Sequence, residues 1–437
     1  MTGLRELSVL MNGVPSARLM RDRHGALSLL YDEQHMDDPS SAPLSLSLPL
    51  SERPHKDAAT TRWIRSLLPD NNDVLRHWYA REEVLEQSLF GLLSTRIGLD
   101  CAGAVQFCPL GEEERLSERA SGITRLTPSE LKRELDTTAG DPNAWLPEDI
   151  EPYFSLGGFQ SKIALHRIDN GWGRPYGNVP TTHILKPRAK ASKFVAVGEH
   201  LCLSAARSLG LNAASSSIEQ HGDNTVLVVE RYDRAHATKG WTRIHQEDMC
   251  QALGFDGDRK YEHSGGPGMS HIGDLIAQQS TQPTEDLRSF AEALIYSWLV
   301  INRDAHARNY SLLYPRHGVQ LAPLYDINSS LMFKRRGIGE ASMAMRYGSA
   351  FTVYSAGSKH ALPDMAKRLR LPAHELIERA EDLATALPGT MEAAINVLPR
   401  ELQSADEIGE FANRMRSRTE DCLQSVAAAR KYTRIHA

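Results

Sequence analysis

The stretch Asn302-Arg303-Asp304-Ala305-His306-Ala307-Arg308-Asn309 decides how this chain is interpreted. Phosphoryl transfer from ATP requires a carboxylate that accepts or orients the attacking hydroxyl and an amide oxygen that holds magnesium, both on one loop. Asp304 and Asn309 have the spacing of the protein-kinase catalytic loop, His-Arg-Asp-x-x-x-x-Asn, with Asn302 in place of the histidine. The same letters also fit a solvated loop in which Asp304 caps a helix, so further signals are needed.

A second acid follows in the order that kinase chemistry requires. An apolar, strand-like segment ends in Tyr325-Asp326-Ile327-Asn328, where kinases carry the magnesium-binding aspartate of Asp-Phe-Gly. Ile-Asn replaces Phe-Gly in this chain, which leaves the metal-binding role of the carboxylate intact. Asp304 is thus predicted as the catalytic residue, and Asn309 and Asp326 as the ligands of Mg²⁺.

A lysine and a glutamate upstream fit the phosphate-binding part of a kinase. The run Thr182-His-Ile-Leu-Lys186 places Lys186 at the end of an apolar strand, as in the Val-Ala-Ile-Lys strand whose ammonium holds the α- and β-phosphates. Glu199 lies on a predicted helix over 194–209 and is the expected ion-pair partner of Lys186. A lysine at a strand end is also a common surface feature, so this pair depends on the order of the other motifs.

Two further segments complete the predicted nucleotide site. The ATP loop, 155–162, reads Ser-Leu-Gly-Gly-Phe-Gln-Ser-Lys, and its backbone N–H groups are suited to cradle phosphate, although it is neither Gly-x-Gly-x-x-Gly nor a Walker A sequence. Glu230-Arg231-Tyr232 ends a β-rich run where the lobes should meet. The backbone of Glu230 and Tyr232 is expected to read the edge of adenine.

The predicted elements follow the order of a two-lobed kinase. Residues 1–110 are predicted as a small mixed strand and helix module, 111–147 as a linker with one helix, 148–235 as a strand-rich N-lobe with the ATP loop and the phosphate lysine, and 236–437 as a helical C-lobe with the catalytic and metal-binding loops. The predicted fold class is α+β: a two-lobed protein-kinase-like fold preceded by a small mixed α/β module.

Three local patterns predict individual elements. The alternation of Leu and Ser over 44–50 predicts a half-buried strand. Thr127-Pro-Ser-Glu130 predicts a helix start with a capping box. The apolar run 290–301 is about 12 residues long and contains Glu292, so it predicts a buried helix, well short of the roughly 20 residues that span a membrane.

Composition limits the remaining possibilities. The chain has 437 residues, a formal net charge of −5, and five scattered cysteines. The slightly acidic balance provides no general cationic field for nucleic acid or membranes, and the cysteines form neither a disulfide framework nor a Cys-x-x-Cys zinc site. With no secretory signal expected at residues 1–9, a reduced, cytoplasmic protein without membrane contact is predicted.

Taken together, the motifs resemble those of the HipA serine/threonine kinase toxins of bacterial type II toxin–antitoxin modules. The similarity covers nearly the full length. It includes the following segments: 43–50, Leu67-Leu-Pro-Asp70, Gly103-Ala-Val105, 155–162, Pro180-Thr-Thr-His-Ile184 with Lys186, Val229-Glu-Arg-Tyr-Asp-Arg234, Gln246-Glu-Asp-Met-Cys-Gln251, Gly265-Gly-Pro-Gly268, Asp304-Ala-His-Ala-Arg-Asn309 and Tyr325-Asp326.

The resemblance implies a role for each matching position. Asp304 would be the proton acceptor, and Asn309 with Asp326 would hold Mg²⁺. The residues implied to bind ATP are Gly157, Gly158, Phe159, Gln160, Ser161, Lys162, Lys186, Glu230, Arg231, Tyr232, His306, Ala307, Arg308, Asn309, Tyr325 and Asp326. The family phosphorylates a serine of its own ATP loop and is thereby inactivated; Ser155 matches that serine, and Ser161 is a nearby alternative.

The resemblance also implies a target and partners. The expected substrate is a bacterial protein, such as glutamyl-tRNA synthetase, whose phosphorylation causes growth arrest and persistence. A HipB-like helix-turn-helix antitoxin is expected to neutralise the toxin and to mediate most of its contact with operator DNA. Candidate basic patches on the chain itself are Lys359-His360, Lys334-Arg-Arg336, and the C-terminal Arg430-Lys431 with Arg434.

Two other functions remain compatible with parts of the sequence. A small-molecule phosphotransferase shares the two-lobed plan and the Asp-to-Asn loop. A non-catalytic co-repressor that acts with its antitoxin on DNA would not need the kinase residues, yet Lys186, Asp304, Asn309 and Asp326 are all present. The kinase is therefore the favoured prediction.

Overall fold

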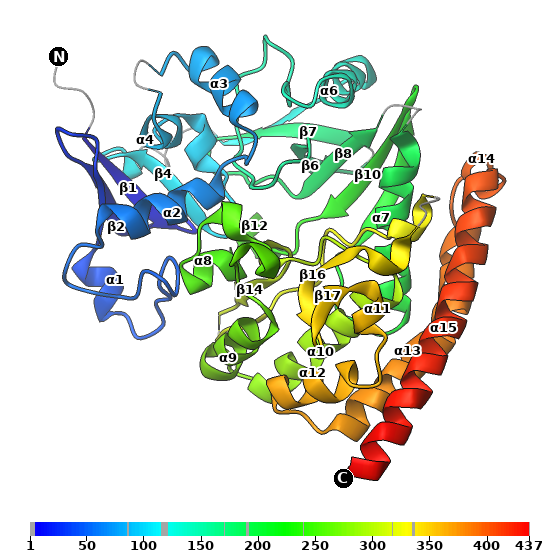
Figure 1. The fold of residues 1–437 in the computed structure, drawn as a ribbon. Helices are drawn as coiled ribbons and strands as arrows, with labels where there is room; N and C mark the ends of the chain where they lie inside the picture. Colours follow the sequence, from blue (N-terminus) through cyan, green and yellow to red (C-terminus); the bar gives the residue numbers. More distant parts are fainter. Residues whose placement is uncertain are drawn as a thin grey trace.

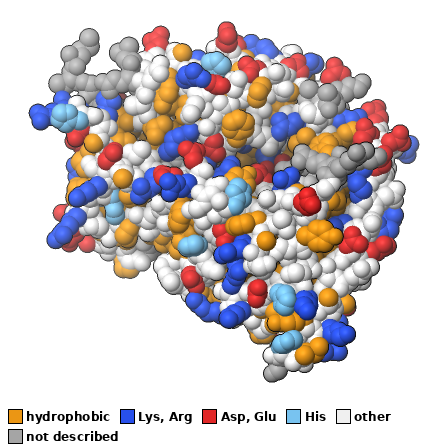
Figure 2. Space-filling model, in the orientation of Figure 1, with side chains coloured by type: hydrophobic (Ala, Val, Ile, Leu, Met, Phe, Trp, Pro, Cys, Tyr) orange, Lys and Arg blue, Asp and Glu red, His pale blue; other side chains and the backbone are white. Residues whose placement is uncertain are grey.

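A computed structural model describes residues 5–84, 87–114, 121–169, 171–188, 192–238, 240–316, 318–333 and 337–436. Figure 1 shows the small N-terminal module on the left in blue, the strand-rich part at the upper right in green, and the helices of the C-terminal half below. The basic run 334–336 lies outside the described residues. On the face in Figure 2, basic and acidic side chains are interspersed, consistent with the small net charge.

The N-terminal module is built on a four-stranded antiparallel sheet in the order β3-β2-β1-β4. The Asn12-Gly13 turn between its first two strands has φ values of 51° and 83°, which favour Asn and Gly. Its elements are β1 (Glu6–Met11), β2 (Val14–Arg21), β3 (Leu27–Tyr31), α1 (Glu33–Asp37), α2 (Asp57–Leu67), α3 (Asn72–Arg81), α4 (Leu89–Leu93), η1 (Arg96–Leu99) and β4 (Val105–Pro109).

The strand predicted over 44–50 is wrong. The segment is a turn with a single bridge between Ser45 and Leu48. Ser45 Oγ donates to Glu247 Oε2 at 2.6 Å and Leu46 N to Glu247 Oε1 at 3.0 Å, so the polar groups bond to one buried carboxylate instead of a neighbouring strand. Leu44 and Leu48 are nevertheless fully buried, whereas Leu46 is half-buried and Leu50 is exposed.

The N-lobe is a six-stranded antiparallel sheet in the order β5-β7-β6-β8-β10-β9. The predicted capping box is confirmed, because Thr127 Oγ1 accepts from Glu130 N and the Glu130 carboxylate accepts from Thr127 N. The elements are β5 (Gly122–Arg125), α6 (Pro128–Gly140), β6 (Ile163–Ile168), β7 (Gly171–Tyr176), β8 (His183–Arg188), α7 (Lys193–Ser208), β9 (Ser216–His221) and β10 (Asn224–Glu230).

The C-terminal half is mainly helical, with α15 lying along α13 at its outer side (Figure 1). It starts with β11 (Arg234–Ala237), β12 (Gly240–Arg243), β13 (His245–Asp248), α8 (Met249–Leu253), η3 (Gly257–Arg259), η4 (Glu262–Ser264), α9 (Met269–Gln279), α10 (Pro283–Leu299), η5 (Ala307–Asn309), β14 (Ser311–Tyr314) and β15 (Gln320–Leu321). It continues with η6 (Ser330–Met332), η7 (Ile338–Glu340), β16 (Ser342–Tyr347), β17 (Ala350–Thr352), α11 (Val353–Ala356), α12 (Ala361–Leu369), α13 (Ala373–Asn396), α14 (Arg400–Gln403) and α15 (Asp406–His436).

Two hydrophobic cores support these parts. One core joins the N-terminal module to the N-lobe sheet, with Trp63 and Phe107 packed in the same cluster as Leu185. The other fills the C-lobe around α10, which is buried along most of its length as predicted, and includes Leu201 of α7. Helix α7 therefore belongs to the N-lobe by sequence position but packs against the C-lobe core. Among the described helices, none is long and apolar enough to cross a membrane.

Candidate active site

The catalytic loop, residues 302–309, follows the buried helix α10. Asn302 Oδ1 accepts from Asp304 N at 3.3 Å, so this residue braces the loop at the position where kinases carry histidine. Asn309 Nδ2 donates to Asp304 O at 2.8 Å. These two amides fix the backbone of the loop, while the Asp304 side chain is 50% exposed. The carboxylate is thus held at the surface of a rigid turn, where a substrate hydroxyl can reach it.

Lys186, Glu199 and Asp326 meet although they lie on three separate elements. Lys186 Nζ, from β8, is 2.7 Å from Glu199 Oε1 of α7 and 3.0 Å from Asp326 Oδ1. Lys186 and Glu199 are nearly inaccessible, whereas the Asp326 side chain is 31% exposed. Asp326 has φ of 54°, an uncommon backbone conformation for aspartate that turns the chain sharply after Leu324 and Tyr325.

The charges of this triad are set by competition between burial and pairing. Burial alone would lower the pKa of Lys186, but the Asp326 and Glu199 carboxylates outweigh it and raise that pKa. Burial likewise opposes ionisation of Asp326, yet Lys186 and Lys162 lower the pKa of its carboxyl group to about 2. Lys186 is therefore an ammonium and Asp326 a carboxylate across the neutral range.

Tyr261 and His306 lie beside the Asp304 carboxylate. The Tyr261 hydroxyl donates to Asp304 Oδ1, and its ring lies edge-on to His306 with centroids 5.0 Å apart. His306 Nε2 is 3.6 Å from the same carboxylate oxygen. Burial lowers the pKa of His306 to about 4, so its imidazole is neutral at pH 7. Asp304 therefore faces polar but uncharged neighbours on this side.

The ATP loop is closed against the N-terminal module. Ser155 is fully buried, and its Oγ donates to Leu67 O at 2.5 Å. Lys162 Nζ donates to Gly157 O at 3.0 Å and lies 4.5 Å from the centre of the Trp145 ring. Burial, assisted by repulsion from Lys186, lowers the pKa of Lys162 to about 7.

The tip of this loop has a different character. Gly158 has φ of 100°, a conformation that a side chain would strain. Phe159 is 65% exposed, and Gln160 and Ser161 follow without regular structure before β6 begins. The loop thus has a fixed base and a tip that projects from the surface.

The segment predicted to contact adenine follows β10. Arg231 N donates to Thr182 O and Glu230 N to Ser215 O, both at 2.9 Å. For Tyr232 N, no backbone acceptor is found among the described residues. The Arg231 side chain points instead into a buried network with Asp233 and Asp100.

Tyr325 contacts Arg308 at the end of the catalytic loop. The Tyr325 hydroxyl donates to Arg308 O at 2.7 Å and its ring centre is 5.7 Å from that of Tyr232. The Arg308 guanidinium turns toward the N-terminal module and bonds to Asp70 and Asp248. The structure therefore brings Lys186, Glu199 and Asp326 together, while Arg231 and Arg308 direct their side chains to other carboxylates.

The donor set suits a hard cation such as Mg²⁺. The Asn309 amide nitrogen donates to Asp304 O, so the amide Oδ1 is left to bind a metal ion. Asp326 accepts from Lys186 through Oδ1 alone. Carboxylate and amide oxygens are the ligands that Mg²⁺ prefers. Within the described residues there is no cluster of three or more His, Cys, Asp or Glu side chains that could hold a metal, so nucleotide phosphates would have to complete the coordination.

Sequence reasoning assigned no role to two residues of the site. Tyr261 precedes the Gly265-Gly-Pro-Gly268 motif, and Asp70 ends Leu67-Leu-Pro-Asp70; both motifs were recognised only as parts of the family resemblance. Neither residue type is diagnostic on its own. Their contacts with Asp304 and Arg308 arise from segments 43 and 238 positions apart in the sequence, which no local pattern reveals.

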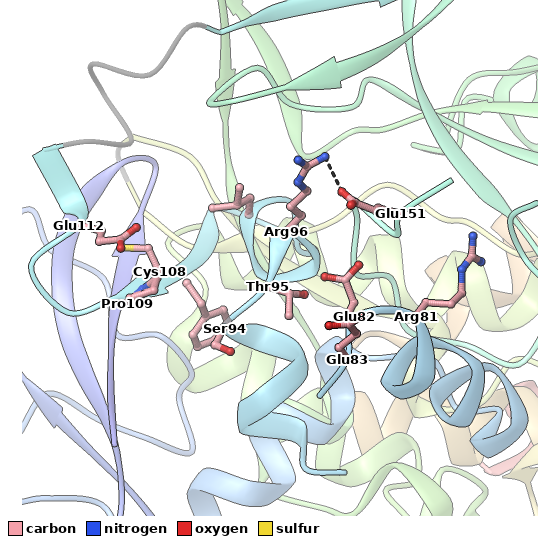
Figure 3. Close-up of a pocket in the computed structure, with 12 residues that line it drawn as sticks. Arg81, Glu82, Glu83, Ser94, Thr95, Arg96, Cys108, Pro109, Glu112 and Glu151 are labelled. Atoms are coloured by element: carbon pink, nitrogen blue, oxygen red, sulfur yellow. Dashed lines mark ion pairs between the residues drawn. The ribbon is translucent and has the colours of Figure 1, made fainter. Parts of the chain in front are cut away.

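A cavity of about 590 Å³ lies elsewhere, in the N-terminal module (Figure 3). Its walls carry charges of both signs, and Arg96 and Glu151 among them form an ion pair of 2.7 Å. None of the described residues that line it belongs to the predicted catalytic or nucleotide residues. The predicted catalytic and nucleotide residues lie apart from this cavity, where β8, α7 and the loop 302–309 meet.

Comparison with known proteins identifies the family. Residues 154–391 match the HipA-like C-terminal domain, and residues 7–108 match the HipA N-terminal domain. The chain is 34% identical over 353 residues to the protein Y4mE of Sinorhizobium fredii, covering 80% of this chain and 82% of that protein. It is 28% identical over 375 residues to the serine/threonine-protein kinase toxin HipA of Shewanella oneidensis, covering 82% of each.

A solved structure supports the same conclusion. A chain in the complex of HipA, HipB and operator DNA from Shewanella oneidensis superposes with a TM-score of 0.81 at 25% identity, covering 97% of this chain and 99% of that one. This match confirms the predicted two-lobed α+β fold over nearly the whole sequence. The chain therefore belongs to the HipA family.

Proposed function

We propose that the chain is an ATP- and Mg²⁺-dependent serine/threonine protein kinase that acts as a growth-arresting toxin. The observation that carries the proposal is the contact of Lys186 with both Glu199 and Asp326, beside a half-exposed Asp304 on the next loop. Phosphoryl transfer requires these groups together, and no purely structural role explains why two of the three carboxylates remain accessible. The named kinase toxin from Shewanella oneidensis supports the same activity.

Each residue has a task in this reaction. Lys186 binds the phosphates and is kept in position by Glu199. Asn309 and Asp326 would hold Mg²⁺, which neutralises charge on the phosphates when bound. Asp304 accepts the proton of the substrate hydroxyl as its oxygen bonds to the γ-phosphorus; the bond to the β–γ bridging oxygen breaks, and ADP leaves with that electron pair.

The substrate is a serine or threonine of a bacterial protein. Resemblance to the kinase toxins favours an aminoacyl-tRNA synthetase such as the glutamyl enzyme, whose inactivation would stop translation and produce growth arrest and persistence. A HipB-like antitoxin and, mainly through it, operator DNA are the proposed partners, by analogy with the Shewanella oneidensis complex. The setting would be the cytoplasm.

Self-inactivation through Ser155 is also proposed. Its hydroxyl is fully buried and donates to the Leu67 carbonyl oxygen, so it can react only after the ATP loop leaves this position. A dianionic phosphoserine could not return, because it would be buried against that carbonyl without a donor. Phosphorylation would therefore hold the loop away from its nucleotide-binding conformation.

A labelling experiment tests the proposed function. Purified protein and its Asp304→Asn variant are incubated with labelled ATP and Mg²⁺, and peptides that contain Ser155 and Ser161 are analysed by mass spectrometry. Label on Ser155 in the native protein and none in the variant is expected. Absence of label in both, with Ser155 unmodified beforehand and ATP binding intact, would contradict the proposal.

A further inference from the structure

The end of helix α2 touches both functional loops of the kinase. We name Ser66, Leu67 and Asp70 the α2 corner. Leu67 O accepts from Ser155 Oγ at 2.5 Å, and Asp70 N donates to Gly158 O at 3.1 Å. The ATP loop is thus held at Ser155 and at Gly158. The corner belongs to the N-terminal module, which contains none of the residues assigned to phosphotransfer.

Arg308 of the catalytic loop is bound by the same corner. Its Nη1 donates to Asp70 Oδ1 at 2.5 Å and its Nη2 to Ser66 O at 3.2 Å, while Nε donates to Asp248 Oδ2 at 3.2 Å. Every nitrogen of the guanidinium is therefore engaged. The side chain is only 8% exposed, and the two carboxylates raise its pKa against the effect of burial.

The position of Arg308 is favoured by the helix itself. The last carbonyl groups of an α-helix have no partner within the helix, and its C-terminus carries partial negative charge. Ser66 O and Leu67 O are two such carbonyls, and they are satisfied by the catalytic loop and by the ATP loop, respectively. A cation at this end of α2 is stabilised by both effects.

Gly157 is what allows this arrangement to be so close. A Cβ atom at this position would lie 2.7 Å from Arg308 Nη2 and 2.9 Å from Ser66 O, nearer than real contacts allow. At Gly157 the ATP loop is thus packed against both the Arg308 side chain and the backbone of the α2 corner, with no space for another atom. Moving one of them requires the others to adjust.

We infer that Asp70 is a positioning residue of the nucleotide site: through Arg308 and Gly158 it holds the ATP loop in its closed form, so that the N-terminal module preorganises ATP binding. The inference rests on the proposed function, since it assumes that the closed loop is the one that receives ATP. The Asp70 side chain acts through Arg308 and is not assigned a contact with the substrate. Its carboxylate is 19% exposed, and the Arg308 guanidinium holds its pKa below the usual range despite burial.

Asp70→Asn isolates the role of the carboxylate because it keeps the shape and the backbone N–H. Binding of a fluorescent ATP analogue with Mg²⁺ is expected to weaken about tenfold, the effect of losing one charged hydrogen bond. Amide hydrogen exchange in the peptide 155–162 should accelerate, whereas exchange in α10 should not change. Asp73→Asn is the matched control, because Asp73 pairs with Arg76 on the exposed surface of the neighbouring helix α3.

A second variant guards against a general loss of folding. Arg308→Lys keeps the charge but loses the fork that reaches Ser66 and Asp70, so it should reproduce the loosened loop. In the double variant the two effects should not add, because both break one network. Additive losses of affinity in the double variant Asp70→Asn/Arg308→Lys would overturn the inference. It would also be overturned if Asp70→Asn bound the analogue as tightly as Asp73→Asn and hydrogen exchange at 155–162 were unchanged.

The outcome for the native protein separates this inference from the proposed function. If native protein fails to bind the analogue, the proposed kinase activity itself is contradicted. If native protein binds and Asp70→Asn binds equally well, only the role of the α2 corner fails. Thermal unfolding of each variant shows whether a loss of binding reflects a loss of fold.

Discussion

Two clusters of paired acidic and basic side chains differ in how the oxygens of their carboxylates are used. The cleft cluster contains Lys186, Glu199, Asp304 and Asp326. The hinge cluster contains Asp100, Arg231, Asp233, Arg234 and Arg243, and every member has a side chain no more than 5% exposed. In the cleft cluster, by contrast, Asp304 is 50% and Asp326 31% exposed.

The carboxylates of the hinge cluster are fully paired within the protein. Asp100 accepts from Arg234 at 3.0 Å, from Arg243 at 3.3 Å, and from Thr181 at 2.6 Å, and Asp233 accepts two bonds from Arg231. Three arginines outnumber two carboxylates, and backbone carbonyls such as Cys101 O accept from further guanidinium nitrogens, although Arg243 Nε is buried without a partner among the described residues. The oxygens of both carboxylates are bonded within the protein, so this network fixes the junction of the N-terminal module with the hinge.

The cleft cluster has the opposite balance. Lys186 faces Glu199 and Asp326, Lys162 also acts on the Asp326 carboxylate, and Asp304 adds a third carboxylate on the catalytic loop. An excess of accessible negative charge is costly unless cations join it, as Mg²⁺ would with ATP. Carboxylates that stay accessible and incompletely paired can bind cations, whereas the buried carboxylates of the hinge cluster have all their partners within the protein.

The largest effect should come from the cleft cluster. Asp304→Asn removes the proton acceptor and is expected to lower the rate of phosphotransfer about 10²–10⁴-fold. ATP affinity should change little, because Asp304 does not contact Lys186. Single-turnover kinetics with labelled ATP measure both quantities, and Asp382→Asn, on the exposed surface of α13, serves as the control. A variant with full activity would remove Asp304 from the mechanism.

Asp100→Asn tests the claim that the hinge cluster is structural. Removing this charge leaves three buried arginines against Asp233 alone, so the free energy of unfolding should fall by about 3–5 kcal/mol. Urea denaturation followed by circular dichroism measures the change. Asp326→Asn should show the reverse: a small loss of stability and a large loss of Mg²⁺–ATP binding. Equal stability losses in both variants would erase the distinction between the clusters.

Much of the cleft cluster was predictable because its residues belong to local motifs. Lys186 ends a clear apolar strand, Glu199 lies on a clear helix, and Asp326 ends an apolar run, so that order along the chain indicated one site. The hinge cluster was not predicted beyond Arg231, which was expected to bind ATP. Its partners Asp100 and Arg243 come from distant segments, and charged residues in a sequence give no sign that they are buried.

Glu247 shows what burial does to a carboxylate without a cation. It is buried beneath the 44–48 turn, accepts from Ser45, Leu46 and Tyr314, and burial raises its pKa to about 7 from 4.5. The folded chain therefore binds this proton more tightly than the unfolded chain, and its contribution to stability is lost as the pH rises from about 4.5 to about 7.

Glu247→Gln should remove this pH dependence. The urea midpoint of the variant relative to that of the native chain is expected to rise between pH 5 and pH 8, because only the native chain must ionise a buried carboxyl group. If the difference between the two midpoints stayed constant with pH, the Glu247 carboxylate would be stabilised in the folded chain as the Asp100 carboxylate is by its arginines. The burial of Glu247 was not predictable from the sequence, since the turn above it was predicted as a strand.

The smallest effect is expected at an exposed pair. Arg370 Nη2 lies 2.6 Å from Asp274 Oδ1, but the side chains are 68% and 47% exposed. Asp274→Asn should change the free energy of unfolding by less than about 1 kcal/mol, since water screens the pair. The same urea titration measures it. If Asp274→Asn lowered the free energy of unfolding as much as Asp100→Asn, exposure would not determine how much these ion pairs stabilise the fold.

Calorimetric titration of Mg²⁺–ATP into the native chain and into Asp326→Asn shows whether the cleft cluster binds the nucleotide. The cleft cluster is expected to bind the nucleotide in the native chain and to lose most of that affinity in the variant, with the fold retained. Binding that is absent from the native chain, or equally tight in Asp326→Asn, would contradict the assignment of kinase chemistry to this cleft.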